Sequence, residues 1–272
     1  MRLGAVSFPL TEPRNYEEWT KEAEKWLKLA AVEKIELLVF PEYFTLALET
    51  DAGFSAWFQN EFHQIFSSFA HQHQMTILAG THNIGTNTAV LFTPDGKSHQ
   101  QHKIHLIPSE TEEAPLITAG NEILVVPFKH GKLATTICYD VEFPELTRAV
   151  VKAGVNLLLC PSWTEKPDGF HRVRYCAHAR AVENQLFVVH APLVGSFSPW
   201  GINENACGSA AILAPSDPQF PANGVLIEGM WNAGDLVFAD VDFEVLQQVR
   251  TKGAVRTYRD FMKPAPFEVK PC

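Results

Sequence analysis

Three side chains that could share one catalytic reaction each lie at the end of a short apolar or hairpin segment. The apolar stretch 37–40 leads through Pro41 to the carboxylate of Glu42, and the stretch 133–137 leads to the thiol of Cys138. Lys103 lies just beyond a predicted hairpin. A carboxylate can act as a general base, a thiolate as a nucleophile, and an ammonium group as a donor to an oxyanion. The three residue types therefore suit nucleophilic cleavage of a carbonyl compound.

The local context of these residues is consistent with such roles. Pro41 ends strand pairing and fixes the direction in which Glu42 leaves the sheet. Cys138 is followed by Phe143-Pro144-Glu145, which predicts a helix start. A thiol at such a strand-to-helix turn lies near free backbone N–H groups and the positive end of a helix. The sequence therefore predicts that the thiolate form of Cys138 is favoured.

Taken singly, each of the three residues has a simpler interpretation. A Pro-Glu pair after a strand is usually a turn, and a cysteine at the end of an apolar strand is usually a small buried hydrophobe. A single lysine in a histidine-rich loop is normally solvated. Only the appearance of all three, each in its own specific context, favours a catalytic site.

The elements that must position these residues alternate along the chain. Amphipathic stretches with apolar residues at i, i+3 and i+4 predict helices, and short apolar runs predict buried strands. Two strand–turn–strand patterns, around 89–97 and 123–137, predict hairpins, which require antiparallel pairing. The sequence thus predicts an α/β protein with mixed sheets. The predicted strands include 37–40, 76–79, 133–137, 156–159 and 186–189, and the predicted helices are about 15–33, 55–74, 143–153 and 170–184.

No repeat, low-complexity linker or shift in composition divides the chain, so residues 1–272 are predicted to form a single domain. The segments 197–205 and about 257–272 are rich in Pro, Gly, Asn and aromatic residues and predict loops. The C-terminal tail carries apolar side chains such as Phe261 and Phe267. It could bury them on a partner subunit or in a groove of its own domain.

Composition and charge exclude several classes of function. The 31 acidic and 22 basic residues give a formal charge of −9, and no Lys/Arg cluster marks a nucleic-acid or anionic-membrane surface. No apolar stretch is long enough for a membrane span, and no signal-peptide pattern precedes the first strand. The five cysteines have irregular spacing and no disulfide pattern, so a cytoplasmic location is expected.

The sequence gives no sign of a cofactor or a metal. The pair His71 and His73 and the group His171, Cys176 and His178 do not match the spacing of a zinc site. No glycine-rich phosphate loop is present. Exposed or helix-packing histidines are the more common interpretation of such groups.

Three motifs resemble those of the nitrilase (carbon–nitrogen hydrolase) superfamily. They are Phe40-Pro41-Glu42, Lys103-Ile104-His105-Leu106 and the block from Cys138 to Glu145, which reads Cys-Tyr-Asp-Val-Glu-Phe-Pro-Glu. The resemblance covers nearly the whole chain, because it continues through residues 161–163, 180–185 and 208–212.

This resemblance implies an α-β-β-α sandwich and a Glu-Lys-Cys triad formed by Glu42, Lys103 and Cys138. It also implies a second glutamate between the lysine and the cysteine. Glu113 matches the family's spacing best, while Glu110 and Glu112 are close alternatives. Members of the superfamily commonly assemble, so a homodimer or larger homo-oligomer is expected.

The residues after the cysteine indicate the branch of the superfamily. True nitrilases usually continue with Trp-Glu, whereas Tyr139-Asp140 resembles the amidase branches. Two positions depart from the family pattern: Glu142 stands where Arg is frequent, and His190 stands where Asn is common. Both departures could alter the substrate pocket.

The expected function is hydrolysis of the carbon–nitrogen bond of a small linear amide, as in ω-amidases and aliphatic amidases, through a Cys138 thioester. Lys103 and the backbone N–H of Tyr139 would hold the oxyanion, and Glu113 would orient the lysine or the substrate. The candidate pocket walls are aromatic: Tyr43, Trp163, His190 and Trp200.

Several alternatives remain open from the sequence. The chain could instead hydrolyse nitriles or N-carbamoyl compounds. Cys138 could act with a histidine such as His178 or His190, as in proteases or acyltransferases. The chain could also be a catalytically silent binding or scaffold subunit.

Overall fold

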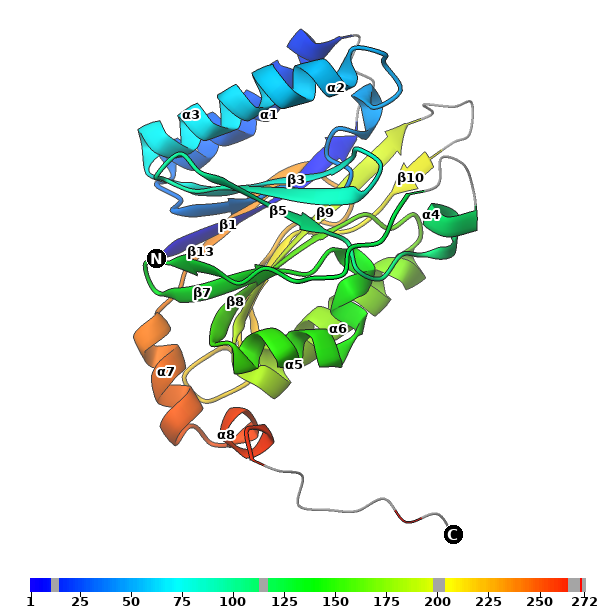
Figure 1. Cartoon of the computed structure of the whole chain (residues 1–272). Coiled ribbons are helices and arrows are strands. Elements are labelled where there is room, and N and C mark those ends of the chain that lie inside the picture. Colours follow the sequence, from blue (N-terminus) through cyan, green and yellow to red (C-terminus); the bar gives the residue numbers. More distant parts are fainter. Residues whose placement is uncertain (11–14, 113–116, 198–203, 264–269, 271–272) are drawn as a thin grey trace.

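Two mixed β-sheets stack face to face in the computed structural model, which describes residues 1–10, 15–112, 117–197, 204–263 and 270 (Figure 1). The first sheet has the strand order β5-β4-β3-β2-β1-β13. Strands β1, β2 and β3 are parallel, while β4, β5 and β13 add antiparallel pairs. The strands are β1 Arg2–Leu10, β2 Leu37–Val39, β3 Thr76–Asn83, β4 Asn87–Phe92, β5 Ser98–His102 and β13 Asp235–Asp240.

The second sheet has the order β6-β7-β8-β9-β11-β12. Here β7, β8 and β9 are parallel, and β6, β11 and β12 pair antiparallel. The two sheets are joined where Phe8–Leu10 of β1 pairs with Leu193–Gly195 of β9. The strands are β6 Val126–Phe128, β7 Gly131–Thr135, β8 Val155–Ser162, β9 Phe187–Phe197, β10 Glu204–Ala206 (which pairs with β9), β11 Ala211–Leu213 and β12 Val225–Glu228.

Helices cover the outer face of each sheet (Figure 1). Helices α1 and α3 lie on the first sheet, and α5 and α6 lie on the second, which confirms the predicted α-β-β-α sandwich with mixed sheets. The helices are α1 Tyr16–Val32, α2 Phe54–Trp57, α3 His63–His73, α4 Pro108–Glu112, α5 Pro144–Lys152, α6 Pro167–Asn184, α7 Phe243–Lys252 and α8 Thr257–Phe261. Short helical segments of other types are η1 Leu46–Leu48, η2 Phe58–Phe62 and η3 Cys138–Glu142.

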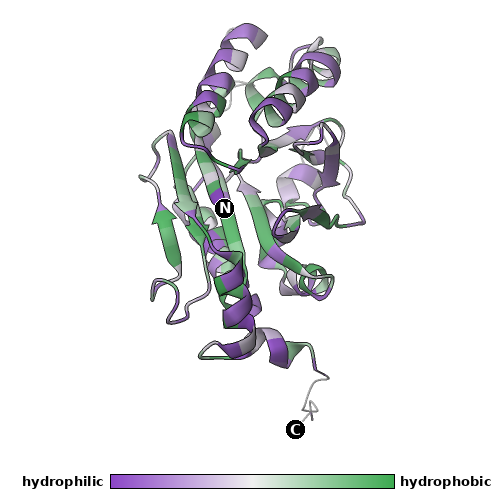
Figure 2. Ribbon diagram, turned by 90° about the vertical axis from the view of Figure 1, so that its left-hand side faces the viewer, coloured by the Kyte–Doolittle hydropathy of each residue, from purple (hydrophilic) through white to green (hydrophobic). Residues whose placement is uncertain are grey.

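The strands have apolar side chains on both faces because both faces are covered. Along β2, Leu37 and Val39 belong to the core between the sheets, while Leu38 and the following Phe40 belong to the core beneath α1 and α3. This alternation is the period of two of a β-strand. Figure 2 shows the resulting contrast between largely hydrophobic strands and helices in which hydrophilic and hydrophobic residues alternate.

Helix α1 illustrates how the sequence sets the outer layer. The Asn15 side chain caps it by accepting a hydrogen bond from Glu18 N at 3.0 Å. Trp19, Ala23 and Leu27 then form a buried stripe at helical spacing, which packs on the first sheet.

Most predicted elements and both hairpins are present. The predicted helix at 55–74 is interrupted by the π-helical segment η2 between α2 and α3. None of the helices in the described part of the chain combines the length and the apolar character needed to cross a membrane.

The two predicted loops differ in part from the structure. Phe197 and Glu204 end paired strands, while residues 198–203 between them lie outside the described part. The predicted tail begins with a short helix, α8. In it, the ring centre of Phe261 lies 4.1 Å from the guanidinium carbon of Arg148 in α5. This part of the tail therefore packs on its own chain, and Phe267 lies outside the described residues.

Candidate active site

Glu42 lies in a turn after β2 that contacts the neighbouring strand β3 of the first sheet. After β2, Phe40 N donates to Leu78 O at 2.9 Å, and Tyr43 has a left-handed backbone (φ 52°). The neighbouring strand bulges at Gly80, where a Cβ atom would lie 2.5 Å from Pro41 O. Glycine is therefore required here for the close approach of the two backbones. As a result, Glu42 as a whole residue is only 1% exposed.

Lys103 comes to Glu42 from the end of the β4–β5 hairpin. Its backbone N donates to Asn87 O at 2.8 Å, which continues the ladder by one residue beyond β5. The Nζ atom lies 2.8 Å from Glu42 Oε1, and the Lys103 side chain is 1% exposed. A buried ammonium group beside a buried carboxylate forms a charge-assisted hydrogen bond.

A second carboxylate, Glu110, contacts the same ammonium group. Its Oε1 and Oε2 lie 3.1 and 3.0 Å from Lys103 Nζ. Ile107 N donates to Oε2 at 2.9 Å and the Tyr43 hydroxyl to Oε1 at 3.0 Å. Glu110 therefore occupies the place that the sequence interpretation gave to Glu113, which itself lies outside the described residues. Glu112, the other alternative, is exposed.

Asn87 joins the two carboxylates and was not anticipated from the sequence. Its Nδ2 donates to Glu42 Oε1 at 2.8 Å and to Glu110 Oε1 at 2.9 Å. A short polar residue at the start of a strand has many uses, so only the fold reveals this contact.

Cys138 lies at the first position of η3 in a strained backbone conformation. Its φ of 46° falls in the left-handed region, which is unfavourable for a residue with a Cβ atom. The Sγ atom donates to Trp163 O at 3.5 Å, and Trp163 N donates to Glu42 Oε2 at 2.8 Å. The backbone of Trp163, just after β8, thus brings the thiol and the carboxylate to one point.

Asp140 connects the turn that carries Cys138 to the loop that follows Lys103, called the lysine loop below. Its carboxylate accepts hydrogen bonds from Ile137 N, Ile104 N and His105 N, and lies 2.9 Å from His105 Nδ1. The His105 ring also stacks on Phe143, with ring centroids 3.6 Å apart. The two motifs that carry Lys103 and Cys138 are therefore connected directly.

The electrostatics of the cluster differ from the prediction of an activated thiolate. Burial, and then the charge of Glu42, raise the pKa of the Cys138 thiol well above its ordinary value, and Lys103 lowers it only in part. The thiolate prediction was therefore wrong for the free protein. Local sequence shows the nearby helix end but not the burial or the adjacent carboxylate.

The other charged groups have complementary shifts. Burial raises the pKa of Glu42 despite Lys103. For Lys103 the opposing effect of burial is outweighed by Glu42 and its other neighbours, which raise the pKa of the ammonium group. Burial also tends to raise the pKa of Glu110, but the Lys103 charge and the hydrogen bond from Asn87 outweigh it, so the pKa of Glu110 is lowered. The resting site thus contains a neutral thiol beside a firmly charged lysine.

A cavity of about 370 Å³ opens over this cluster. Glu42, Lys103, Glu110 and Cys138 line it, together with three aromatic residues, Tyr43, Tyr139 and Trp163. Its size suits a small ligand. The structure thus brings Tyr43, Tyr139 and Trp163 to the cavity, while Trp200 lies outside the described residues.

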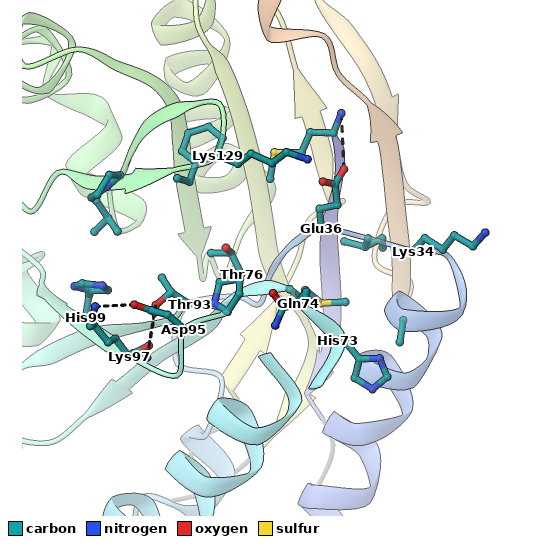
Figure 3. Close-up of a pocket in the computed structure, with 18 residues that line it drawn as sticks. Lys34, Glu36, His73, Gln74, Thr76, Thr93, Asp95, Lys97, His99 and Lys129 are labelled. Atoms are coloured by element: carbon teal, nitrogen blue, oxygen red, sulfur yellow. Dashed lines mark hydrogen bonds and ion pairs between the residues drawn. The ribbon is translucent and has the colours of Figure 1, made fainter. Parts of the chain in front are cut away.

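A larger cavity of about 830 Å³ lies at another edge of the two sheets (Figure 3). Lys34, Glu36, His73, Asp95 and Lys129 are among its lining residues. Among the described residues that line it there is no cysteine or serine to act as a nucleophile, so size alone does not locate the chemistry.

Comparison with known proteins decides the family. The model of the family described as "Carbon-nitrogen hydrolase" matches residues 11–251. The chain belongs to the carbon–nitrogen hydrolase family. The predicted membership of the nitrilase superfamily is thereby confirmed.

Individual relatives support this membership. The chain is 31% identical to "Probable hydrolase YhcX" of Bacillus subtilis over 96% of its own length, but spans only 53% of that protein. It is 28% identical to the "Deaminated glutathione amidase" of a Synechocystis strain, covering 95% of this chain and 98% of the relative. The structure of Saccharomyces cerevisiae Nit3, of the nitrilase superfamily, matches with a TM-score of 0.73 and 21% identity over 92% of this chain and 93% of Nit3.

The first departure from the carbon–nitrogen hydrolase pattern is compensated nearby. Glu142, at the position where the resemblance led us to expect Arg, lines the cavity and pairs with Arg172 of α6 at 2.8 Å. The negative charge of Glu142 is therefore balanced by a cation from a different element. The sequence could not reveal this pairing, because the two residues lie 30 positions apart.

The second departure does not concern the cavity, which corrects the prediction for His190. This residue is fully buried and is not part of the cavity lining. Its Nε2 lies 2.7 Å from Ser162 Oγ, and Arg174 Nε donates to its Nδ1 at 3.0 Å. The ring faces α6, where it stacks on Phe170, and so serves packing.

The histidine-based alternative loses support from this geometry. Within the described residues, the hydrogen-bond partner of the Cys138 thiol is a carbonyl oxygen, and neither His178 nor His190 forms a hydrogen bond with it. The described residues also contain no group of three His, Cys, Asp or Glu side chains that could hold a metal ion.

Proposed function

We propose that this carbon–nitrogen hydrolase cleaves the C–N bond of a small linear amide, with Cys138 as nucleophile, Glu42 as general acid and base, and Lys103 as oxyanion donor. The observation that carries the proposal is the buried Glu42–Lys103–Glu110 cluster beside a thiol on the floor of a small cavity. Burying three charged groups carries a large desolvation free energy that their pairing offsets only in part, so such a cluster is expected where it has a function.

In acylation, Glu42 acts first as a base and then as an acid. Glu42 takes the thiol proton while Cys138 Sγ forms a bond to the amide carbon and the carbonyl electrons move to oxygen. The C–N bond then breaks, Glu42 returns its proton to the departing nitrogen, and ammonia or an amine leaves a thioester. The neutral resting thiol is consistent with this order, because proton removal accompanies attack.

Deacylation uses the same carboxylate again, first as a base and then as an acid. With the amine gone, Glu42 takes a proton from a water molecule as the water oxygen attacks the thioester carbon. The C–S bond breaks, the carboxylic acid leaves, and Glu42 returns the proton to sulfur. The raised pKa of Glu42 brings this carboxyl closer to the range in which it can accept and donate protons near neutral pH.

Lys103 and the Tyr139 N–H would hold the oxyanion in both steps. Tyr139 is the second residue of η3, where backbone N–H groups have no acceptor within the helical segment. Removing one such donor typically costs about 3 kcal/mol of transition-state stabilisation. Glu110 and Asn87 hold Lys103 and Glu42 in place.

The test is a panel of small linear amides, N-carbamoyl compounds and nitriles, with ammonia release as the readout. We expect turnover of amides, and a fall in kcat of about 10⁴-fold or more in Cys138→Ala because the nucleophile is lost. Cys176→Ala, a half-exposed cysteine on α6, is the matched control and should keep its activity. Wild-type activity in Cys138→Ala would refute the assignment, and turnover of nitriles or carbamoyl compounds alone would refute the substrate class.

A further inference from the structure

A carboxyl group outside the proposed catalytic cluster also lines the cavity. Glu49 follows η1, and with Leu46 and Asn83 it forms one wall of the 370 Å³ cavity. Its Oε1 accepts hydrogen bonds from Thr45 Oγ1 at 2.8 Å and from Asn83 N at 3.1 Å. Among the described residues, no cationic side chain forms an ion pair with it.

The side chain of Glu49 is held by a buried relay. Thr45 Oγ1 donates to Glu49, so the hydroxyl oxygen accepts from His82 Nδ1, which lies 2.7 Å away. Phe58 and Phe62 of the π-helical segment η2 enclose the His82 ring, with centroids 4.6 Å away in each case. Such π-helical turns are frequent at functional sites.

Holding the charged form of Glu49 at this place lowers the stability of the folded protein. Burial raises the pKa of Glu49 to about 7, while Thr45 and Asn83 lower it only in part. Burial also lowers the pKa of His82 to about 3, so this ring stays neutral and cannot balance a charge on Glu49. A polar network that fixes an unbalanced carboxyl at a cavity wall is expected where a ligand supplies the missing charge.

The other carboxyl groups that line the cavity outside the catalytic cluster differ from Glu49 in their electrostatic surroundings. Glu142 is paired with Arg172 at 2.8 Å, so its charge is balanced within the protein. Glu165 and Asp168 lie at the exposed edge of the cavity, where water screens them. Glu49 is therefore the carboxyl on the cavity wall, outside the catalytic cluster, that is both sheltered and without a cation among the described residues.

We propose that Glu49 determines substrate specificity by binding a protonated amino group on the substrate, away from the amide that is cleaved. The inference rests on the proposed amide hydrolysis and narrows its substrate class to cationic amino amides. Thr45 and His82 are positioning residues, because they act through Glu49.

The test compares two amides of equal length, 5-aminopentanamide and hexanamide, which differ in a terminal ammonium against a methyl group. We expect wild type to prefer the cationic amide and Glu49→Gln to reduce this preference by at least about tenfold, mainly through KM. Glu49→Gln keeps the size of the side chain and an oxygen that can accept from Thr45. Glu61→Gln removes an exposed glutamate of η2 outside the cavity lining and should keep the preference.

Two results would overturn the proposal. One is a wild type that turns over hexanamide, or the anionic analogue glutaramic acid, at least as efficiently as the cationic amide. The other is an equal loss for both amides in Glu49→Gln, which would indicate a merely structural role. Failure of the proposed function is a separate result, namely no Cys138-dependent turnover of any amide.

Discussion

At the scale of single residues, Lys103 lies between two carboxylates that differ in their electrostatic state. Burial raises the pKa of Glu42. Burial opposes ionisation of Glu110 as well, but the Lys103 charge and the hydrogen bonds from Asn87 and Ile107 N lower the pKa of Glu110. Groups with such separated pKa values can take different roles. Glu110 remains charged and holds the lysine, while Glu42 is free to exchange a proton.

This division of roles predicts the effect of Glu110→Gln. The variant keeps the shape but removes a charge from Lys103, so we expect kcat for the amide substrate to fall by about 10²-fold. Glu112→Gln, an exposed residue at the end of the same helix, is the matched control and should keep wild-type kcat.

Glu113→Gln completes the comparison, because the sequence favoured that position. Steady-state kinetics of the three variants would decide among them. If Glu113→Gln lost more activity than Glu110→Gln, the assignment of Glu110 would be wrong.

The sequence predicted the residues of this cluster better than their electrostatic states. Glu42, Lys103 and Cys138 could be selected because each is part of a motif. The choice of Glu110 over Glu113 depends on the turn in which Ile107 N donates to Glu110, and spacing does not reveal such a turn. Asn87 and Arg172 act through contacts between distant elements, which no local pattern reveals.

At the scale of elements, the site depends on a connection between two loops. Asp140 accepts from Ile104 N and His105 N of the lysine loop and from Ile137 N before the cysteine. A buried carboxylate with several donors is a strong structural link, because its removal leaves those donors unpaired.

Asp140→Ala should therefore lower the free energy of unfolding by about 2–4 kcal/mol and also lower kcat, because Lys103 and Cys138 lose their common support. Chemical denaturation and steady-state kinetics measure the two effects. His105→Phe is the comparison variant: it can retain stacking on Phe143 and the backbone hydrogen bond to Asp140 but loses the side-chain contact of Nδ1 with Asp140, and should have a smaller effect. An Asp140→Ala variant as stable and active as wild type would contradict this role.

The elements themselves were largely predictable, because their apolar periodicity reflects two covered sheets. The strand predicted at 156–159 is the centre of β8, and the helix predicted at 170–184 corresponds to α6. The π-helical segment η2 was not predicted, because its packing around His82 comes from the tertiary structure. Helix α8 was missed for a similar reason: its Phe261 packs against α5.

At the scale of the whole molecule, the partly buried carboxyl of Glu49 links stability to pH. Glu49 has a pKa of about 7 in the folded protein, above its ordinary value of 4.5, because of burial. Between these pH values the folded state holds a proton that the unfolded state releases, so stability falls as pH rises. The groups facing Glu49 include the neutral His82 relay and the hydroxyl of Tyr43, whose own pKa burial raises.

Glu49→Gln should remove this dependence. We expect the stability of the variant relative to wild type to be about 1 to 3 kcal/mol more favourable at pH 8 than at pH 5. Urea denaturation at the two pH values measures the change, with Glu61→Gln as an exposed control. An unchanged difference between pH 5 and pH 8 would show that Glu49 does not titrate in this range.

The predicted homodimer or larger assembly also belongs to this scale and stays a prediction. The described surface carries a cluster of exposed aromatic side chains in which His171 stacks with Tyr175 and Trp231. Clusters of this kind are where an assembly would bury apolar surface.

The central claim is that Cys138 forms a thioester with the acyl part of the substrate. Mass spectrometry of the protein, acid-quenched during turnover of an activated ester of a small carboxylic acid, tests it most directly. We predict the added mass of one acyl group on the peptide that contains Cys138, and no addition in Cys138→Ala. An acyl group on any other residue, or ester turnover with no adduct on Cys138, would contradict the account.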